Sequence, residues 1–239
     1  MTSTLPNQAK VMIGMVAVAS LCPLSLGVIN WHTPAWPQFA LLLIAAALTS
    51  RLKVKLPGMT STMSGNLPVI LLAVTQLGLF ASLLVAITAA VAQSFASGKQ
   101  VKPVQFLFNT CTLMNASALA YAVYHSHLLA GFGNGTALAL VAASAVYFLA
   151  NTAPVAAIIA LTENNNPFTI WHKVFLWSFP NYVIGAGLTA IASQFGSVAS
   201  MVTVGSLLLV LFGVYKSYLM FVAQTEQSAP KALAMAAGR

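Results

Sequence analysis

Charge is what this sequence has least of. Only 5% of its 239 residues are charged, and Glu163 and Glu226 are its two acids. A soluble globular domain carries about 25% charged residues. So few charges cannot cover a surface that faces water, which excludes a soluble globular protein. Because 59% of the residues are hydrophobic, the composition predicts an integral membrane protein that crosses the bilayer several times.

Residues and motifs that carry chemistry are also scarce. The two cysteines, Cys22 and Cys111, both lie in apolar runs, so we expect neither a disulfide framework nor a cysteine metal site. No Ser-His-Asp, His-Glu-x-x-His, Cys-x-x-Cys or P-loop pattern is present. His125 and His127 are two positions apart and therefore do not share a helix face. We expect no enzyme activity, no bound metal and no cofactor.

The surplus of positive charge indicates membrane orientation rather than nucleic-acid binding. The chain has 10 Lys and Arg residues and a net charge of +8. Its densest basic group, Arg51, Lys53 and Lys55, is too short for a nucleic-acid-binding patch. Basic residues flank membrane spans on the cytoplasmic side. We therefore expect the lipid bilayer, and no nucleic acid, among the partners.

Hydrophobic stretches long enough to cross a bilayer recur along the chain, since a spanning helix needs about 20 apolar residues. They cover residues 11–30, 36–50, 67–97, 103–125, 136–162, 170–194 and 197–223. The third stretch is too long for one ordinary span and is interrupted at 76–78 by Gln-Leu-Gly. It is either one steeply tilted helix or two helices that meet near Gly78. We expect a single membrane domain over 1–223 and a short polar cytoplasmic tail over 224–239.

The positive charges favour two helices over 67–97. With a hairpin there, the chain has about eight segments, both termini are cytoplasmic, and the basic connections all lie inside. The outer connections at 31–35, 78–80, 126–135 and 195–197 contain neither Lys nor Arg. The first half of the hairpin has about 12 residues, or about 18 Å, and would not cross the bilayer. The predicted fold is therefore an all-α polytopic transmembrane bundle that includes a short half-helix, buried in protein or lining a cavity.

Three stretches and their order resemble a known kind of membrane region. They are RLKVKLPGMTSTMSGNLPVILLAVTQLG at 51–78, LFNTCTLMNASALAYAVYHS at 107–126, and the long run 147–186 that begins YFLANTAP. Together they resemble the multi-span, vitamin-uptake-like sensor region at the N-terminus of bacterial HD-GYP and GGDEF signalling proteins. They are also similar to the substrate-binding S components of energy-coupling factor transporters. The resemblance covers residues 36–223 and implies a multi-pass protein of the bacterial cytoplasmic (inner) membrane that binds a small organic molecule.

The resemblance and the charges disagree about the loop at 51–66. In S components the equivalent loop, here from Leu56 to Pro68, lies outside and covers the ligand, whereas the positive charges place it inside. The sequence leaves both alternatives open. No HD-GYP or GGDEF sequence follows residue 223, so the resemblance implies that a membrane or cytoplasmic partner protein supplies the output or the energy coupling.

Polar residues within the spans are candidates for a binding site because they are costly in lipid and face the bundle interior. The spans contain no acid in their interiors, which argues against a proton-driven pump built on a membrane carboxylate. Asn109, Thr112 and Asn115 recur every three residues in the fifth segment. They either make interhelical hydrogen bonds or form the polar wall of a cavity.

The sixth segment contains Asn151, Thr152 and Pro154 near its middle. Pro154 cannot donate to the carbonyl of Ala150, which predicts a kink. Asn151 or Thr152 could satisfy the freed carbonyl. The alternatives are a kink sealed by neighbouring helices and a broken helix that lines a site in mid-membrane, as in transporters.

Aromatic residues crowd the start of the next segment. Trp171 fits an interfacial belt, but Trp177, Asn181 and Tyr182 lie deeper in the sequence of the span. Aromatic rings beside an amide and a proline could stack a flat organic ligand, or could simply pack. In the preceding turn, Glu163 could pair with Lys173 or His172.

Three functions remain open. The first, which we favour, is a small-molecule-binding membrane module, either sensor-like or S-component-like. Its predicted ligand residues are Asn109, Thr112, Asn115, Asn151, Thr152, Pro154, Trp177, Asn181 and Tyr182. The second is a structural or accessory subunit of a larger membrane complex, which would use a lipid-facing patch such as Ala116 and Ala120 against its partner. The third is a secondary transporter, although no internal repeat is found.

Overall fold

The computed structural model describes residues 5–31, 33–51, 53–55, 62–95, 102–126 and 135–193, together with helical positions 202, 205, 206 and 213. The chain divides into two units, Met1–Val204 and Gly205–Arg239. Nearly all of the described residues belong to the first unit. The predicted segment at 197–223 lies almost wholly outside the described residues, as does the tail at 224–239.

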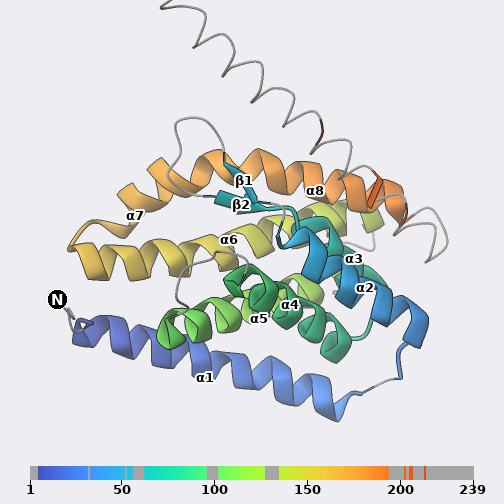
Figure 1. Cartoon of the computed structure of the whole chain (residues 1–239), viewed down its shortest axis with the longest axis horizontal. Coiled ribbons are helices and arrows are strands. Elements are labelled where there is room, and N and C mark those ends of the chain that lie inside the picture. The colour runs from blue at the N-terminus through green and yellow to red at the C-terminus, as the bar shows by residue number, and fades with distance from the viewer. Residues whose placement is uncertain are drawn as a thin grey trace, which may run out of the picture. The chain divides into compact units, whose positions relative to one another are not determined.

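The described part of the chain is almost entirely helical (Figure 1). Its helices are α1 (Asn7–Ile29), α2 (Trp36–Thr49), α3 (Leu67–Gln76), α4 (Leu79–Phe95), α5 (Pro103–Tyr124), α6 (Gly135–Glu163), α7 (Pro167–Ile170) and α8 (Phe179–Ala192). A π-helical turn at Trp171–Phe175 and a 3-10 turn at Leu176–Ser178 connect α7 to α8. These bounds follow the predicted hydrophobic segments closely.

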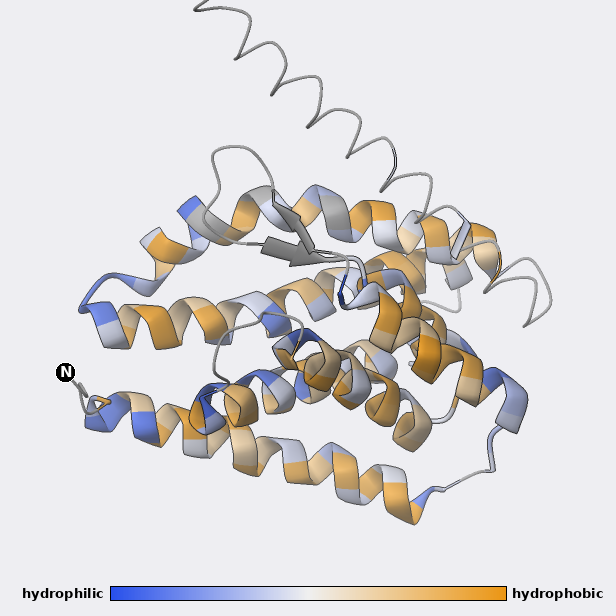
Figure 2. Cartoon of the chain, viewed as in Figure 1, coloured by the Kyte–Doolittle hydropathy of each residue, from blue (hydrophilic) through white to orange (hydrophobic). Residues whose placement is uncertain are grey.

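Three of the helices are long and apolar enough to cross a membrane. They are α1, α5 and, from Thr136 onward, α6. The helices α2, α3, α4 and the Tyr182–Ala192 part of α8 are apolar but shorter. Figure 2 shows that α2, α3 and α4 are hydrophobic over most of their length. The prediction of a helical, membrane-type fold is confirmed at this level.

The long stretch at 67–97 forms two helices rather than one tilted helix. The helix α3 has 10 residues and ends at Gln76, and α4 begins at Leu79. The Ser82 hydroxyl donates to the Ala73 carbonyl across the turn at 2.8 Å. Gly78 at the turn is exposed. Of the two alternatives for 67–97, the structure therefore shows the one with two helices, of which α3 is the short half-helix.

Two short strands are the element that the all-α prediction did not include. β1 (Lys53–Lys55) pairs antiparallel with β2 (Thr62–Ser64), with Lys53 opposite Ser64. Each strand has only 3 residues. Strands this short leave almost no alternation to detect in a sequence. They join the end of α2 to the start of α3.

The helix α5 lies at the centre of the first unit. It contacts α1, α3, α4 and α6, and α6 in turn contacts α8 (Figure 1). Ala116 and Ala120 of α5 are both fully buried against these neighbours. The expectation that they form a lipid-facing patch for a partner protein is therefore wrong. Small residues here let the neighbouring helices approach the central one closely.

The helix α8 closes the bundle against α3. A Cβ atom at Gly185 would lie only 2.7 Å from Leu67 Cδ2, so a larger residue would require the Leu67 side chain to move. The Thr189 hydroxyl donates to the Gly185 carbonyl at 2.9 Å and approaches the Pro68 carbonyl at 3.4 Å. This contact holds the start of α3, and thus the end of the β-hairpin, beside α8.

Candidate functional site

Two hydrogen bonds join α6 to the irregular segment that precedes and begins α8. The Asn151 amide donates to the Tyr182 hydroxyl at 3.2 Å. The Trp171 indole N–H donates to the Thr152 hydroxyl at 2.9 Å, and that hydroxyl donates to the Phe148 carbonyl at 2.7 Å. Two adjacent residues of α6 thus bind Trp171 and Tyr182, which are 11 residues apart in the sequence.

Phe148 is the centre of this contact. Its ring is 2% exposed and lies 4.8 Å from the Tyr182 ring, 5.3 Å from Phe179 and 5.8 Å from Trp171. The Tyr182 and Phe179 contacts are edge-to-face, the geometry that aromatic pairs prefer. We call the residues Phe148, Asn151, Thr152, Trp171, Phe179 and Tyr182 the aromatic–amide cluster.

The segment opposite α6 changes its helical form because of its prolines and caps. The Asn166 side chain accepts from the backbone N–H groups of Phe168 and Thr169, which starts α7 at Pro167. Pro180 lacks an N–H and cannot donate to the Leu176 carbonyl. The chain passes through the π-helical and 3-10 turns immediately before this proline. Single π-helical turns occur frequently at functional sites.

Of the two alternatives for the Pro154 region, the broken helix is not found. The helix α6 continues as one element through Pro154 to Glu163, with a length of 29 residues. Neither Asn151 nor Thr152 bonds to the Ala150 carbonyl in the described hydrogen bonds; they reach Tyr182 and Phe148 instead. The broken-helix alternative is therefore wrong, and the irregular backbone lies in the following segment, at 171–178. A long apolar helix tolerates a proline where neighbouring helices pack around it.

The nine residues predicted to bind a ligand do not all lie together in the structure. Asn151, Thr152 and Tyr182 meet in the aromatic–amide cluster, and Pro154 is half-buried one turn away on α6. The side chains of Trp177 and Asn181 lie outside the described part of the structure. The sequence therefore identified three members of the aromatic–amide cluster.

The three polar residues of α5 have separate surroundings. Asn115 donates its amide to the Val16 carbonyl of α1 at 3.1 Å, which is the interhelical hydrogen bond that one of the two alternatives predicted. Asn109 is exposed. Thr112 is 2% exposed, and its hydroxyl has no hydrogen-bond partner among the described residues. No described hydrogen bond joins these three residues to the aromatic–amide cluster.

Several members of the cluster are not predicted by the sequence pattern. The sequence analysis did not identify Phe148. It assigned Trp171 to an interfacial belt, whereas in the structure the Trp171 indole N–H donates to the Thr152 hydroxyl. Ser144 also contributes, because its hydroxyl donates to the Tyr182 carbonyl at 2.9 Å. The sequence does contain a signal for them: Phe148 follows Ser144 by four positions, and Asn151 and Thr152 follow Phe148 by three and four, which places all of them near one helix face.

The turn between α6 and α7 forms no ion pair among the described residues. Glu163 accepts from the Asn165 amide at 3.4 Å rather than pairing with Lys173 or His172. All of the residues from Thr162 to Thr169 are exposed. A solvated pair across such a turn would contribute little in any case.

The chemistry that the cluster can perform is binding. Its groups are aromatic rings, one amide and two hydroxyls, which suit stacking and hydrogen bonding to a flat, uncharged organic group. No group of three or more His, Cys, Asp or Glu residues that could hold a metal occurs among the described residues. No family model, no curated protein and no solved structure matches the chain in a sequence or structure comparison.

Two threonine substitutions distinguish a paired from an unpaired hydroxyl. Thr152→Val leaves the Trp171 N–H without its acceptor and is expected to destabilise the fold by about 1–3 kcal/mol. Thr112→Val removes a buried hydroxyl that has no described partner, and is expected to be neutral or to stabilise by up to about 1 kcal/mol. Thermal unfolding in a mild detergent measures both. Equal destabilisation by the two variants would contradict the assignment of Thr112 as unpaired.

Proposed function

We propose that the chain is an integral membrane module that binds a small, flat organic molecule at the aromatic–amide cluster. The observation that carries the proposal is the placement of Asn151, Thr152 and Tyr182 around the Phe148 ring, next to the π-helical turn. Polar groups buried in a membrane bundle are costly, and those that persist frequently mark binding sites. The resemblance to vitamin-uptake-like sensor regions and S components supports the same class of function.

Ligand entry in this proposal separates α6 from the segment at 167–182. The described side-chain contacts across this boundary are ring contacts of Phe148 and Tyr147 and three hydrogen bonds, of which the Asn151–Tyr182 bond is the longest at 3.2 Å. Phe168, at the start of this segment, is 69% exposed. A ligand that offers a carbonyl or ring nitrogen would take over the Asn151 donor while its ring replaces one of the stacked aromatic contacts.

The proposed orientation has both termini in the cytoplasm of a bacterium, across its inner membrane. Lys10, Lys102 and Lys173 are exposed and belong to the start of α1, the start of α5 and the turn after α7. Figure 1 places these three regions at the same end of the bundle. Positive charge gathered at one end supports a cytoplasmic position for that end. A sensor-like module would pass its signal to a partner protein there, and an S-component-like one would engage an energy-coupling partner.

Native mass spectrometry of the protein, released gently from its own membrane, tests the proposal. We expect a discrete small-molecule adduct on the wild-type chain that is lost in Asn151→Leu, because leucine keeps the branched shape of the side chain but removes the amide. Thr162→Val is the matched control, since Thr162 lies on the same helix, is exposed and bonds only to its own helix in the described contacts.

Retention of the adduct in Asn151→Leu would contradict the site. A wild-type chain that carries no small molecule, and that is recovered only in complex with another protein, would favour the accessory-subunit alternative. Accumulation of a solute by vesicles that contain this chain alone would favour a secondary transporter.

A further inference from the structure

The Asn151 side chain has hydrogen-bonding groups that its described contacts do not use. A primary amide carries two N–H donors and one carbonyl acceptor. One N–H of Asn151 donates to the Tyr182 hydroxyl at 3.2 Å. The other N–H and the side-chain carbonyl have no partner among the described residues. An N–H donor and a carbonyl acceptor of one planar group therefore remain for a bound molecule.

This amide lies at a depth where water is scarce. The helix α6 is one of the helices long and apolar enough to cross a membrane. About 18 Å of helix separates Asn151 from Glu163, where α6 ends in an exposed polar turn. Asn151 therefore lies near the middle of a hydrocarbon core of about 30 Å. Polar groups at this depth need partners in the protein or in a bound molecule, and Asn151 is only half-buried.

Neighbouring side chains hold the amide in place before a ligand binds. The Tyr182 hydroxyl accepts one N–H of Asn151, and the Tyr182 ring lies edge-to-face on Phe148 at 4.8 Å. The Ser144 hydroxyl fixes the backbone beneath that ring by donating to the Tyr182 carbonyl at 2.9 Å. A binding group that is already oriented loses little conformational freedom when the ligand arrives.

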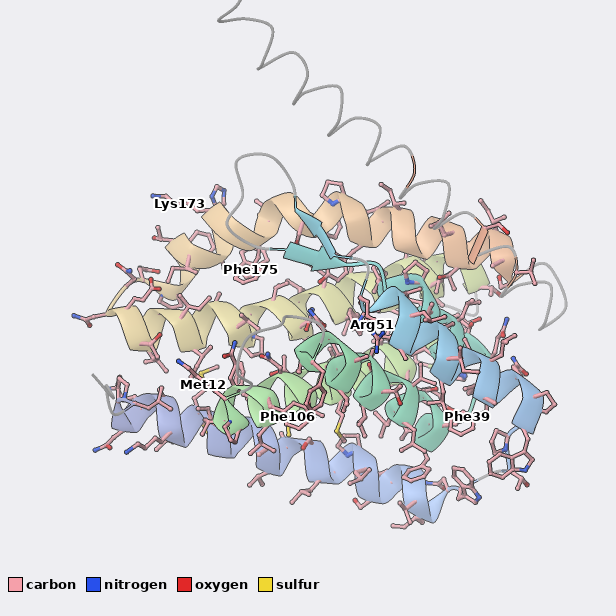
Figure 3. All side chains as sticks on the ribbon, in the orientation of Figure 1. Met12, Phe39, Arg51, Phe106, Lys173 and Phe175 are labelled. Atoms are coloured by element: carbon pink, nitrogen blue, oxygen red, sulfur yellow. The ribbon has the colours of Figure 1, made fainter. Side chains whose placement is uncertain are left out.

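The surroundings of the amide carry no charge. None of the six residues of the aromatic–amide cluster is acidic or basic. Lys173, which lies in the segment between Trp171 and Tyr182, is exposed. Figure 3 shows Lys173 on the side of that segment that faces away from α6. The cluster therefore offers no counter-ion to a charged ligand, and burying an unpaired charge there would be costly.

A planar amide matches a flat partner that presents an acceptor and a donor side by side, as asparagine matches the edge of adenine. We propose that the ligand of the aromatic–amide cluster is an uncharged planar nitrogen heterocycle with an N–H donor next to a carbonyl or ring-nitrogen acceptor. The ligand acceptor takes an N–H of Asn151, and the ligand N–H donates to the Asn151 carbonyl. The inference rests on the proposed function and specifies the chemical class of its ligand.

The test compares three flat bicyclic probes on the full-length protein in a mild detergent. Phthalimide has an N–H between two carbonyls, N-methylphthalimide lacks that N–H, and naphthalene has no polar edge. Unfolding temperatures over a series of probe concentrations give the affinity for each probe, because a ligand that binds only the folded state stabilises it. Protein-free micelles correct for the probe that partitions into detergent. The variants are Asn151→Leu and, as the control, Thr162→Val, which alters an exposed residue of the same helix.

We expect the wild type and Thr162→Val to bind phthalimide about tenfold or more tightly than either other probe, because a site built to bond an N–H rejects an analogue that lacks it. Asn151→Leu is expected to bind phthalimide and N-methylphthalimide with similar affinity, since its aromatic contacts remain. Equal affinities of the three probes for the wild type would overturn the inference. So would a preference for phthalimide that survives in Asn151→Leu or disappears equally in Thr162→Val.

The two proposals fail in different ways. A wild-type chain that carries a native adduct, loses it in Asn151→Leu and yet binds the three probes equally has the binding site but not the recognition of a donor–acceptor edge. A wild-type chain that carries no adduct and binds none of the probes refutes both proposals. If Asn151→Leu does not fold, the preference of the wild type for phthalimide over N-methylphthalimide and naphthalene decides.

Discussion

Replacing Phe148 by alanine is expected to destabilise the protein by about 3–5 kcal/mol, the usual cost of removing a large buried aromatic side chain. The Phe148 ring is 2% exposed and contacts the rings of Trp171, Phe179 and Tyr182. Its loss leaves a cavity between α6 and the segment that leads into α8. In a membrane protein this penalty comes chiefly from lost packing, because lipid offers little hydrophobic driving force between helices.

The matched control for this prediction is Leu149→Ala. Leu149 is the next residue of α6 and is 49% exposed, so its truncation is expected to cost less than about 1 kcal/mol. Unfolding of each variant by increasing dodecyl sulfate in a mild detergent, followed by tryptophan fluorescence, gives the free energies of unfolding. If Phe148→Ala costs no more than Leu149→Ala, the cluster does not hold α6 to α8.

The second large effect is expected from Gly27→Leu in α1. A Cβ atom at Gly27 would lie 3.1 Å from Phe80 Cα and 3.2 Å from the Phe80 backbone nitrogen. Because the obstacle is backbone, it cannot rotate away, and α1 has to move off α4. We expect a destabilisation of about 1–3 kcal/mol or more, together with loss of the edge-to-face contact between Trp31 and Phe80.

Gly14→Leu provides the comparison within the same helix. A Cβ atom at Gly14 has nothing within 4 Å, so leucine is accommodated there. Leucine is also the better helix former, which makes a small stabilisation the expected result. Thermal unfolding followed by circular dichroism measures both variants. Similar unfolding temperatures for the two leucine variants would contradict the close approach of α1 and α4 at Gly27.

Much of the helical framework could be predicted because it depends on properties that are local in the sequence. The bounds of α1, α2 and α5 lie within a few residues of the hydrophobic segments, since the length of an apolar run determines how far a membrane helix extends. The interruption at Gln76 to Gly78 correctly marked the turn between α3 and α4. The two strands were missed because three residues each carry too little pattern.

The direction in which each helix faces could not be predicted. Polar residues such as Asn109, Thr110 and Asn115 are spread around the helix α5, so no single apolar stripe in its sequence distinguishes a lipid-facing position from a central one. Ala116 and Ala120 were expected to face lipid, yet both are fully buried. Only the arrangement of α1, α3, α4 and α6 around α5 determines this, and that arrangement depends on contacts between residues far apart in the chain.

The aromatic–amide cluster was likewise predictable from the sequence only in part. The sequence by itself determined that this is a membrane-type helical protein, and that polar and aromatic residues lie in the middle of its sixth and seventh segments. The tertiary structure decided which of them meet: Asn151 with Tyr182, Thr152 with Trp171, and Phe148 between them. The composition and length of an apolar run depend only on residues that are neighbours in the sequence. Which side chains pair across two helices depends on how those helices pack, and the sequence of one segment does not determine that.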